Sequence, residues 1–170
     1  MKKITILLLL LTLIFTFNLV SCNKEENSEN TAIEVSDYAF ETVVESLLNE
    51  DVLSNVISYT KDGENVLDAD YFEYYFSDPA LLEGISEYFY CTSATTSVSE
   101  VGIFQVKDSD TKESLLKAFD TRQSTLVSTY ESYSPEDVQI AENMKKGSFD
   151  DIVWFVATTD NDTLSEIIKK

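Results

Sequence analysis

Residues 100–119, EVGIFQVKDSDTKESLLKAF, hold the clearest structural signal in the chain. The first eight are rich in β-branched and aromatic side chains, which favours a strand over Glu100 to Lys107. The capping box Asp110-Thr111-Lys112-Glu113 follows and is typical of a helix start. Beyond it, apolar residues that share about a third of the helix circumference predict a long helix over residues 110–131: Leu115, Leu116, Phe119, Leu126, Val127 and Tyr130.

The flanking segments predict further strands. Residues 85–92 are also β-branched and aromatic, and a Ser/Thr-rich link joins them to residues 100–107, so the two segments should pair as antiparallel strands. On the other side, residues 134–137 (SPED) indicate one helical turn. A hairpin is then expected, with a turn at residues 145–148 (KKGS) and a strand over residues 151–158.

The strand-to-helix junction occurs twice with similar sequence. The residues of DSDT (108–111) and LLK (115–117) match DNDT (160–163) and IIK (167–169), and each pair lies 52 positions apart. A strand-strand-helix unit repeated once would give an α+β fold, a four-stranded antiparallel sheet with two helices packed on one face. Chance similarity of two such junctions is the alternative.

Three shorter helices complete the expected fold. Ser36 could cap a helix over residues 37–49, where apolar residues recur at spacings of three and four. A second helix is expected over residues 68–76, and the capping box at residues 163–166 indicates a final one. Residues 50–66 give no clear pattern apart from a turn near their end.

The start of the chain is typical of a bacterial lipoprotein precursor. A short positive start precedes an almost wholly apolar run from Ile4 to Val20. The sequence Leu19-Val20-Ser21-Cys22 resembles the lipobox, in which the cysteine thiol receives a diacylglyceryl group before cleavage. We therefore expect residues 1–21 to be removed and lipid on Cys22 to hold the protein on the cell membrane, facing outside the cytoplasm. A plain secretory signal or an uncleaved anchor are the alternatives.

Composition limits the class of protein. Residues 22–35 are polar and predict a flexible tether, which leaves residues 36–170 as a single acidic α+β domain. The chain has 12 basic and 31 acidic residues, and loss of Lys2 and Lys3 gives a net charge of 10 minus 31, or −21. Coulomb repulsion at this charge opposes nucleic acid as a partner.

Two residue types narrow the possible chemistry. The sequence contains no histidine, which removes Ser-His and Cys-His nucleophilic systems and the usual zinc sites. Once Cys22 carries lipid, Cys91 has no cysteine partner in the chain, so we expect it to be a small buried residue.

The segment EVGIFQVKD (100–108), a helix carrying Arg122 and Gln123, and SPE (134–136) ahead of a strand resemble a known lipoprotein family. It is the family called domain of unknown function 4358, and the resemblance covers about residues 67–170. It implies a small extracytoplasmic lipoprotein domain with no assigned activity.

Several short motifs have a chemical and a structural interpretation. Ser109 to Lys112 and Ser114 to Lys117 fit S-x-x-K, but the SDN and KTG motifs of penicillin-binding enzymes are missing. Capping and surface solvation explain these residues without catalysis and are the preferred interpretation. The aspartates of residues 108–110 and 160–162 could offer oxygens to calcium, although helix capping is the preferred interpretation.

Two further candidates concern ligand binding. The aromatic cluster YFEYYF (71–76) could bind a peptide or sugar, but a helix that faces the core and leaves some tyrosines outside is the preferred interpretation. Arg122 could anchor a carboxylate within the fold, or it could bind an anionic ligand, and the neighbouring Gln123 needs partners if it is buried.

We therefore expect a non-enzymatic binding or interaction module, tethered to the membrane through Cys22, with an unknown protein, peptide or glycan ligand. No catalytic residue, metal site or cofactor is expected, and Arg122 is the candidate ligand-binding residue. The alternative is an envelope hydrolase that uses carboxylates or a Ser-Lys pair. A structural lipoprotein whose acidic surface gathers divalent cations is a third possibility.

Overall fold

The computed structural model describes residues 31–34 and 36–170, so Cys22, the predicted signal peptide and most of the predicted tether lie outside the described residues. Among the described residues we find no helix with the length and apolarity needed to cross a bilayer. The chain contacts the domain before Ser36. The Ile33 amide donates to the Lys107 carbonyl at 3.0 Å, and the Ser109 amide donates to the Thr31 carbonyl at 3.1 Å.

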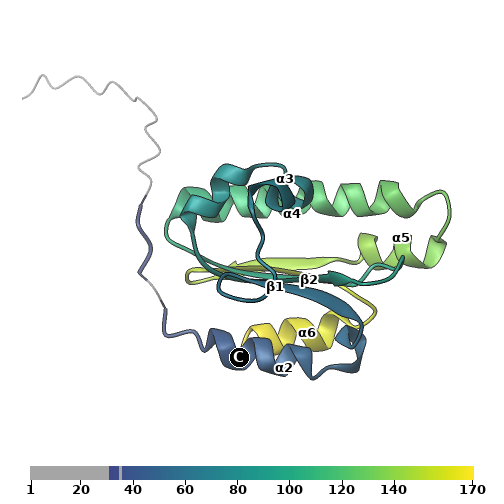
Figure 1. Ribbon diagram of the computed structural model, residues 1–170, viewed down its shortest axis with the longest axis horizontal. Coiled ribbons are helices and arrows are strands. Elements are labelled where there is room, and N and C mark those ends of the chain that lie inside the picture. Colours follow the sequence, from purple (N-terminus) through teal and green to yellow (C-terminus); the bar gives the residue numbers. More distant parts are fainter. Residues whose placement is uncertain (1–30, 35) are drawn as a thin grey trace, which may run out of the picture.

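The centre of the domain is a five-stranded antiparallel sheet (Figure 1). Its strands lie in the order β1-β2-β3-β5-β4. The predicted pairing of residues 85–92 with residues 100–107 is confirmed, with Tyr88 opposite Phe104 and Cys91 opposite Val101. The strands are β1 (Val56–Thr60), β2 (Ile85–Ser93), β3 (Glu100–Val106), β4 (Lys145–Phe149) and β5 (Ile152–Ala157).

The prediction of four strands is therefore wrong: β1 was missed, and the first strand of the expected hairpin lies at β4 and not before residue 145, where α5 stands. Strand β1 lies within residues 50–66, which gave no clear pattern, and β4 begins inside the expected turn at residues 145–148. Each is five residues long and pairs on one side only. Short edge strands need little apolar sequence, because much of their surface faces water.

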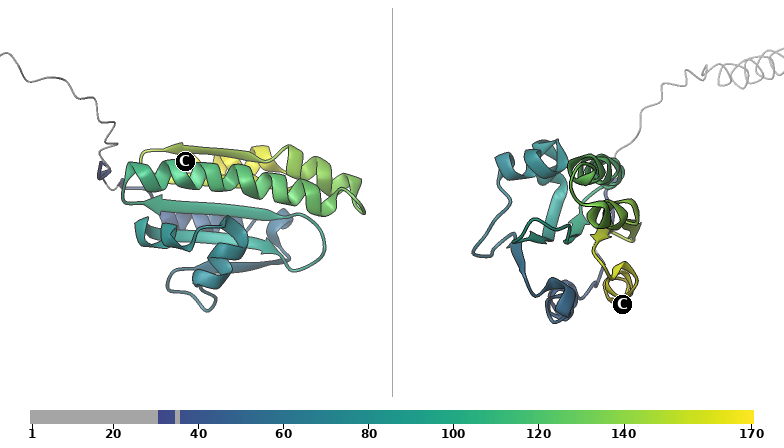
Figure 2. Two further views of the ribbon diagram at one scale, coloured as in Figure 1. Left: turned by 90° about the horizontal axis from the view of Figure 1, so that it is seen from above. Right: turned by 90° about the vertical axis from the view of Figure 1, so that its right-hand side faces the viewer.

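Helices cover both faces of the sheet (Figure 1; Figure 2). Helices α3, α4 and α5 pack on one face, which we call the α4 face. Helices α2 and α6 pack on the other, the α6 face. The helices are α2 (Phe40–Leu48), α3 (Ala69–Phe76), α4 (Ser109–Tyr130), α5 (Pro135–Glu142) and α6 (Asn161–Ile168), with short 3-10 turns at Asp51–Leu53 and Pro79–Gly84.

The strand-strand-helix order does occur twice, as β2-β3-α4 and β4-β5-α6, but the two helices lie on opposite faces. Val101 packs in the core of the α6 face, whereas Val153, the residue 52 positions later, packs in the core of the α4 face. Ile103 and Phe155 differ in the same way. The expectation that both helices share one face is therefore wrong, because matched strand positions point in opposite directions.

The helix caps use the aspartate of each junction. Asp108 accepts from the Thr111 amide at 2.8 Å and is the N-cap of α4. The expected N-cap, Asp110, lies two residues later and is already inside the helix. Asp160 caps α6 in the same way through the Thr163 amide at 3.1 Å. Ser134 caps α5, which continues to Glu142 and so exceeds the single turn that was expected.

Asp151 fixes the segment before α2 to the β4-β5 turn. The carboxylate accepts from the Ser36 amide at 3.1 Å, from the Ser36 hydroxyl, and from Gln105 Nε2 at 2.8 Å. Burial acts to raise the pKa of Asp151, but the bonds from Ser36 and Gln105 outweigh it and lower that pKa. Ser36 thus binds Asp151 instead of capping α2, whose N-cap residue, Ala39, makes no side-chain cap bond.

Asp151→Asn is expected to lower the free energy of unfolding by about 1–3 kcal/mol at neutral pH, because both carboxylate oxygens accept hydrogen bonds and an amide keeps one acceptor oxygen and no charge. The folded-state pKa is lowered, so the stabilisation is present above the ordinary aspartate pKa of about 3.9 and is lost as the pH falls through the folded-state value. Urea unfolding at neutral pH and at about pH 2 measures this dependence. An equal difference between variant and wild type at both pH values would contradict it.

Candidate functional site

Arg122 and Glu100 form a buried ion pair on the α4 face. Arg122 projects from the middle of α4, and Glu100 is the first residue of β3. Arg122 Nε donates to Glu100 Oε2 at 2.9 Å, and an Arg122 Nη donates to Glu100 Oε1 at 2.5 Å. Arg122 is 9% exposed and Glu100 is 3% exposed. Arg122 therefore anchors a carboxylate within the fold, and its binding of an external ligand stays a prediction.

The pair supplies the electrostatic compensation that two buried charges need. Burial lowers the pKa of Arg122, but the hydrogen bond and the negative charge of Glu100 outweigh it and raise that pKa. Thr92 Oγ1 also lies 3.5 Å from Glu100 Oε1. The planar guanidinium and the carboxylate meet through two parallel contacts, a geometry that lysine could not reproduce.

Tyrosine rings enclose the pair. The Arg122 guanidinium carbon lies 5.1 Å from the centre of the Tyr75 ring, within range of a cation-π contact. The Tyr75 and Tyr90 ring centres are 4.8 Å apart. Burial raises the pKa of Tyr75 to about 12, with smaller contributions from Tyr59 and Glu100. The buried Tyr90 hydroxyl has no hydrogen-bond partner among the described residues.

The aromatic cluster at residues 71–76 divides between core and surface. Phe72 and Phe76 are buried, as the core-facing interpretation predicts, whereas Tyr71 is 50% exposed and Tyr74 is 74% exposed. The Tyr71 ring centre lies 6.1 Å from that of Tyr59 on β1. The helix α3 thus uses one side for packing and leaves the other in contact with solvent.

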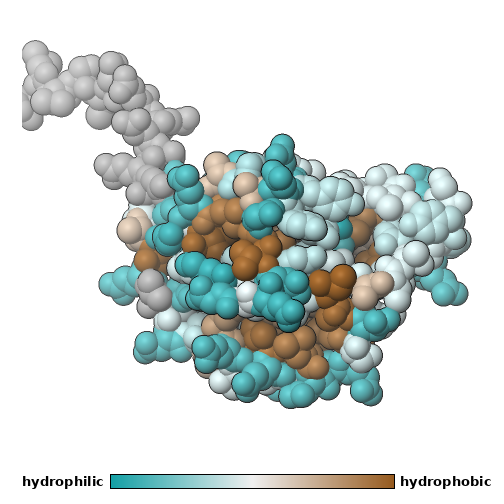
Figure 3. All heavy atoms as spheres, viewed as in Figure 1, coloured by the Kyte–Doolittle hydropathy of each residue, from teal (hydrophilic) through white to brown (hydrophobic). Residues whose placement is uncertain are grey.

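We call the resulting surface the tyrosine face. Its members lie on β1 and α3, at the edge of the α4 face: Ile57, Tyr59, Tyr71, Tyr74 and Tyr75. Ile57 is 42% exposed and points to the same side of β1 as Tyr59, two residues later. Figure 3 shows hydrophobic residues exposed on both sides of the sheet edge that faces the viewer. The tyrosine face is therefore the candidate interaction surface among the described residues.

The structure does not bring the S-x-x-K residues into this site. Ser109 lies at the start of α4, and Arg122 follows 13 residues later on the same helix, so the two are about 20 Å apart along the helix axis. The Lys112 ammonium donates to the Asp150 carbonyl at 2.8 Å. Lys117 forms an exposed ion pair with Glu113 at 2.7 Å. Each lysine therefore contacts a partner other than the nearby serine.

The aspartates considered for calcium binding act as caps or in an exposed ion pair. Asp108 and Asp160 cap α4 and α6, and Asp162 pairs with Lys145. In the part of the chain that the structure describes, no group of three or more acidic, histidine or cysteine residues is arranged to hold a metal ion.

Gln123 and Cys91 both contribute to the folded structure of the domain. Gln123 Nε2 donates to the carbonyls of Ala141 and Glu142, both at 3.0 Å, and so joins α4 to the end of α5. Cys91 is fully buried, as expected, and burial raises the pKa of its thiol to about 12.

Sequence reasoning missed three members of the site: Glu100, Tyr59 and Tyr90. Tyr59 belongs to an edge strand that was not predicted, and Tyr90 was seen only as part of an apolar strand. Glu100 did carry a usable signal, because it is a charged residue at the start of a strand that is otherwise buried. Arg122 is likewise a charged residue among the buried residues of α4. Buried charges of opposite sign are generally paired, so the two could have been matched.

Comparison with known proteins gives one match. The family described as Domain of unknown function (DUF4358) matches residues 78–158. The matched segment runs from β2 to β5 with α4 and α5, and it includes both members of the ion pair, while β1 and α3 precede it. No curated protein and no solved structure matches the chain.

Proposed function

We propose that this chain, which has a DUF4358 domain at residues 78–158, is a membrane-tethered extracytoplasmic lipoprotein that acts as a non-enzymatic binding module. Lipid on Cys22 holds the protein on the cell membrane, and the tyrosine face binds a protein, peptide or glycan ligand. Arg122 supports this face through its cation-π contact with Tyr75.

The observation that carries this proposal is the exposure of Tyr71 and Tyr74 next to Tyr75, whose ring packs against Tyr90. Tyrosine offers a broad apolar ring and a polar tip, and it loses little conformational entropy on binding. Tyr74 lies 4.9 Å from Tyr75, measured between ring centres, and Tyr75 is itself fixed against Tyr90 and Arg122. A surface that is already ordered binds at a lower entropic cost than a mobile one.

Tyr74→Ala is expected to weaken ligand binding several-fold without changing the melting temperature, because the side chain is mostly exposed. The first probe is purified peptidoglycan, measured by co-sedimentation, and the second is an array of immobilised peptides. Tyr133→Ala is the matched control, since Tyr133 is also exposed, at 61%, but follows α4 and lies outside the tyrosine face. Loss of binding in both variants, or no binding of the wild type to either probe, would refute the proposal.

Cys22→Ala is expected to abolish retention in the membrane fraction while the domain stays folded. The variant lacks the thiol that would receive the lipid, whereas the described contacts of the domain begin at Thr31. Cell fractionation, with circular dichroism of the released protein, tests both parts. A processed Cys22→Ala protein that remained in the membrane fraction would show that lipid on this cysteine is not the anchor.

A further inference from the structure

A groove on the α6 face of the sheet lies on the side opposite the tyrosine face. It has a volume of about 500 Å³, within the usual range for ligand sites. One wall is the half-buried pair Phe40 and Val44, one turn apart on α2. Polar residues at the ends of three strands line its floor: Thr60, Ser86 and Gln105. The groove therefore has an apolar wall and a floor that can hydrogen-bond.

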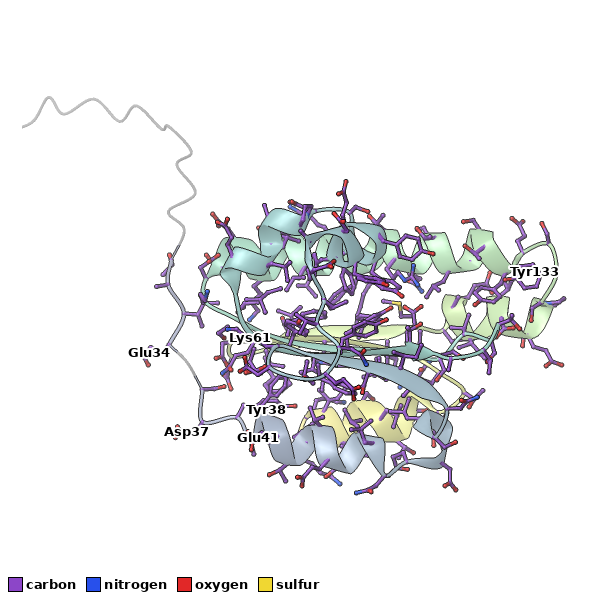
Figure 4. The ribbon with its side chains drawn as sticks, in the orientation of Figure 1. Glu34, Asp37, Tyr38, Glu41, Lys61 and Tyr133 are labelled. Carbon is purple, nitrogen blue, oxygen red and sulfur yellow. The ribbon has the colours of Figure 1, made fainter. Side chains whose placement is uncertain are left out.

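The groove carries negative charge. Three acidic residues line it, Glu41, Asp62 and Glu87, and the described lining includes no lysine or arginine. The ammonium of the neighbouring Lys61 donates to the carbonyl of Ser86, itself a lining residue, at 2.5 Å, so three acidic residues and one basic residue lie at the groove. Figure 4 shows Glu34 and Asp37 on the same side of the domain as Glu41 and Lys61. The local field favours a cationic ligand, in keeping with the acidic chain as a whole.

We propose that this groove binds an extended basic segment of a partner protein, in which lysine or arginine alternates with apolar residues. Glu41 lines the groove from α2 and Glu87 from β2, and both carboxylates can pair with basic side chains of such a segment. The apolar side chains, or the methylene stems of the basic ones, pack against Phe40 and Val44. This site goes beyond the proposed function, because it shares no residue with the tyrosine face.

The experiment uses a fluorescein-labelled octapeptide of alternating lysine and leucine, with binding measured by fluorescence anisotropy in low-salt buffer. Glu41→Gln combined with Glu87→Gln removes two charges from the groove. Its control is Glu45→Gln combined with Glu73→Gln, which removes the same charge from exposed positions on α2 and α3 outside the groove. Glu45 follows Glu41 by one turn, so the control tests position on the same helix.

The groove variant is expected to raise the dissociation constant roughly tenfold, and the control less than about twofold. A peptide of alternating lysine and serine, with the same charge, is expected to bind the wild type more weakly. Tyr74→Ala is expected to leave the dissociation constant unchanged, which separates this site from the tyrosine face. Equal weakening in both double variants, equal affinity for the two peptides, or no binding to the wild type would overturn the proposal.

Discussion

Arg122→Ala is expected to lower the free energy of unfolding by about 3–5 kcal/mol, because it leaves the Glu100 carboxylate buried without a counter-charge. Glu100 is 3% exposed, and its other side-chain contact is the Thr92 hydroxyl at 3.5 Å. The variant also removes the cation beneath the Tyr75 ring. A small domain is stable by about 5–15 kcal/mol in total, so the loss is a large share.

Urea unfolding followed by the fluorescence of Trp154, the single tryptophan, measures this effect. Trp154 is 7% exposed and therefore reports the loss of the core. Ser124→Ala, at an exposed position on α4 two residues away, is the matched control and should change the free energy by less than about 0.5 kcal/mol. Arg122→Lys should also destabilise, because a single ammonium cannot make both guanidinium contacts.

A double variant separates the charge from the packing. Arg122→Met with Glu100→Gln removes both charges and keeps side chains of similar size, so it should recover much of the stability lost in Arg122→Ala. If the double variant were as unstable as Arg122→Ala, the loss would come from packing and not from the unpaired carboxylate. If Arg122→Ala were as stable as the wild type, the ion pair would have no structural role.

The central part of the fold could be predicted from sequence because its signals are local and strong. The strands at β2, β3 and β5 are rich in β-branched and aromatic residues, and the long apolar stripe of α4 repeats over several turns. The edge strands β1 and β4 could not be found in this way, because a half-exposed strand of five residues needs no long apolar run. Strand β1 pairs with β2, which is distant in sequence. Strand β4 pairs with β5, but its KKGS sequence is typical of a turn.

The site was harder to predict than the fold, because its contacts join separate elements. Arg122 was identified as a candidate, and anchoring a carboxylate was one of its two interpretations. The partner, Glu100, lies 22 residues earlier, and the sequence contains 31 acidic residues from which to choose. The choice depends on which end of β3 passes beneath the middle of α4, and no local pattern contains that information.

The aromatic cluster illustrates the same limit on a single helix. Residues 71–76 cover more than one turn of α3, so some of them must face the core and others the solvent. Phe72 and Phe76 are four residues apart and therefore lie on the same side of the helix. Sequence spacing therefore separates these two from Tyr74. It cannot show that Tyr75 turns toward Arg122, because that depends on where α3 docks relative to α4.

Phe76→Ala is expected to destabilise the domain by about 3–5 kcal/mol, because it opens a cavity where several aromatic rings meet. Phe76 is 1% exposed, and its ring centre lies 5.4 Å from that of Phe104 and 5.5 Å from that of Tyr90. Contacts with Phe119 on α4 and Phe155 on β5 complete the enclosure. Phe76 therefore packs the short helix α3 against both the sheet and α4.

The cavity should stay largely open because the surrounding rings are held by other contacts. The rings of Phe104 and Phe155 pack directly on the backbone of Gly102 in the middle of β3, where a Cβ would lie 2.4 Å from the Phe155 ring. Phe76→Leu, which keeps most of the volume, should cost less than half as much as Phe76→Ala. Tyr74→Ala, on the same helix but 74% exposed, should stay within about 0.5 kcal/mol of the wild type.

Comparing these variants also tests whether the tyrosine face depends on its base. If α3 loosens in Phe76→Ala, Tyr71 and Tyr74 lose their fixed positions, and ligand binding should weaken at temperatures where β2 and β3 remain folded. Hydrogen exchange of the α3 amides, compared with those of β3, measures this local opening. Exchange that accelerates equally in both elements would mean that α3 unfolds only together with the sheet. Phe76 would then act on ligand binding through global stability alone.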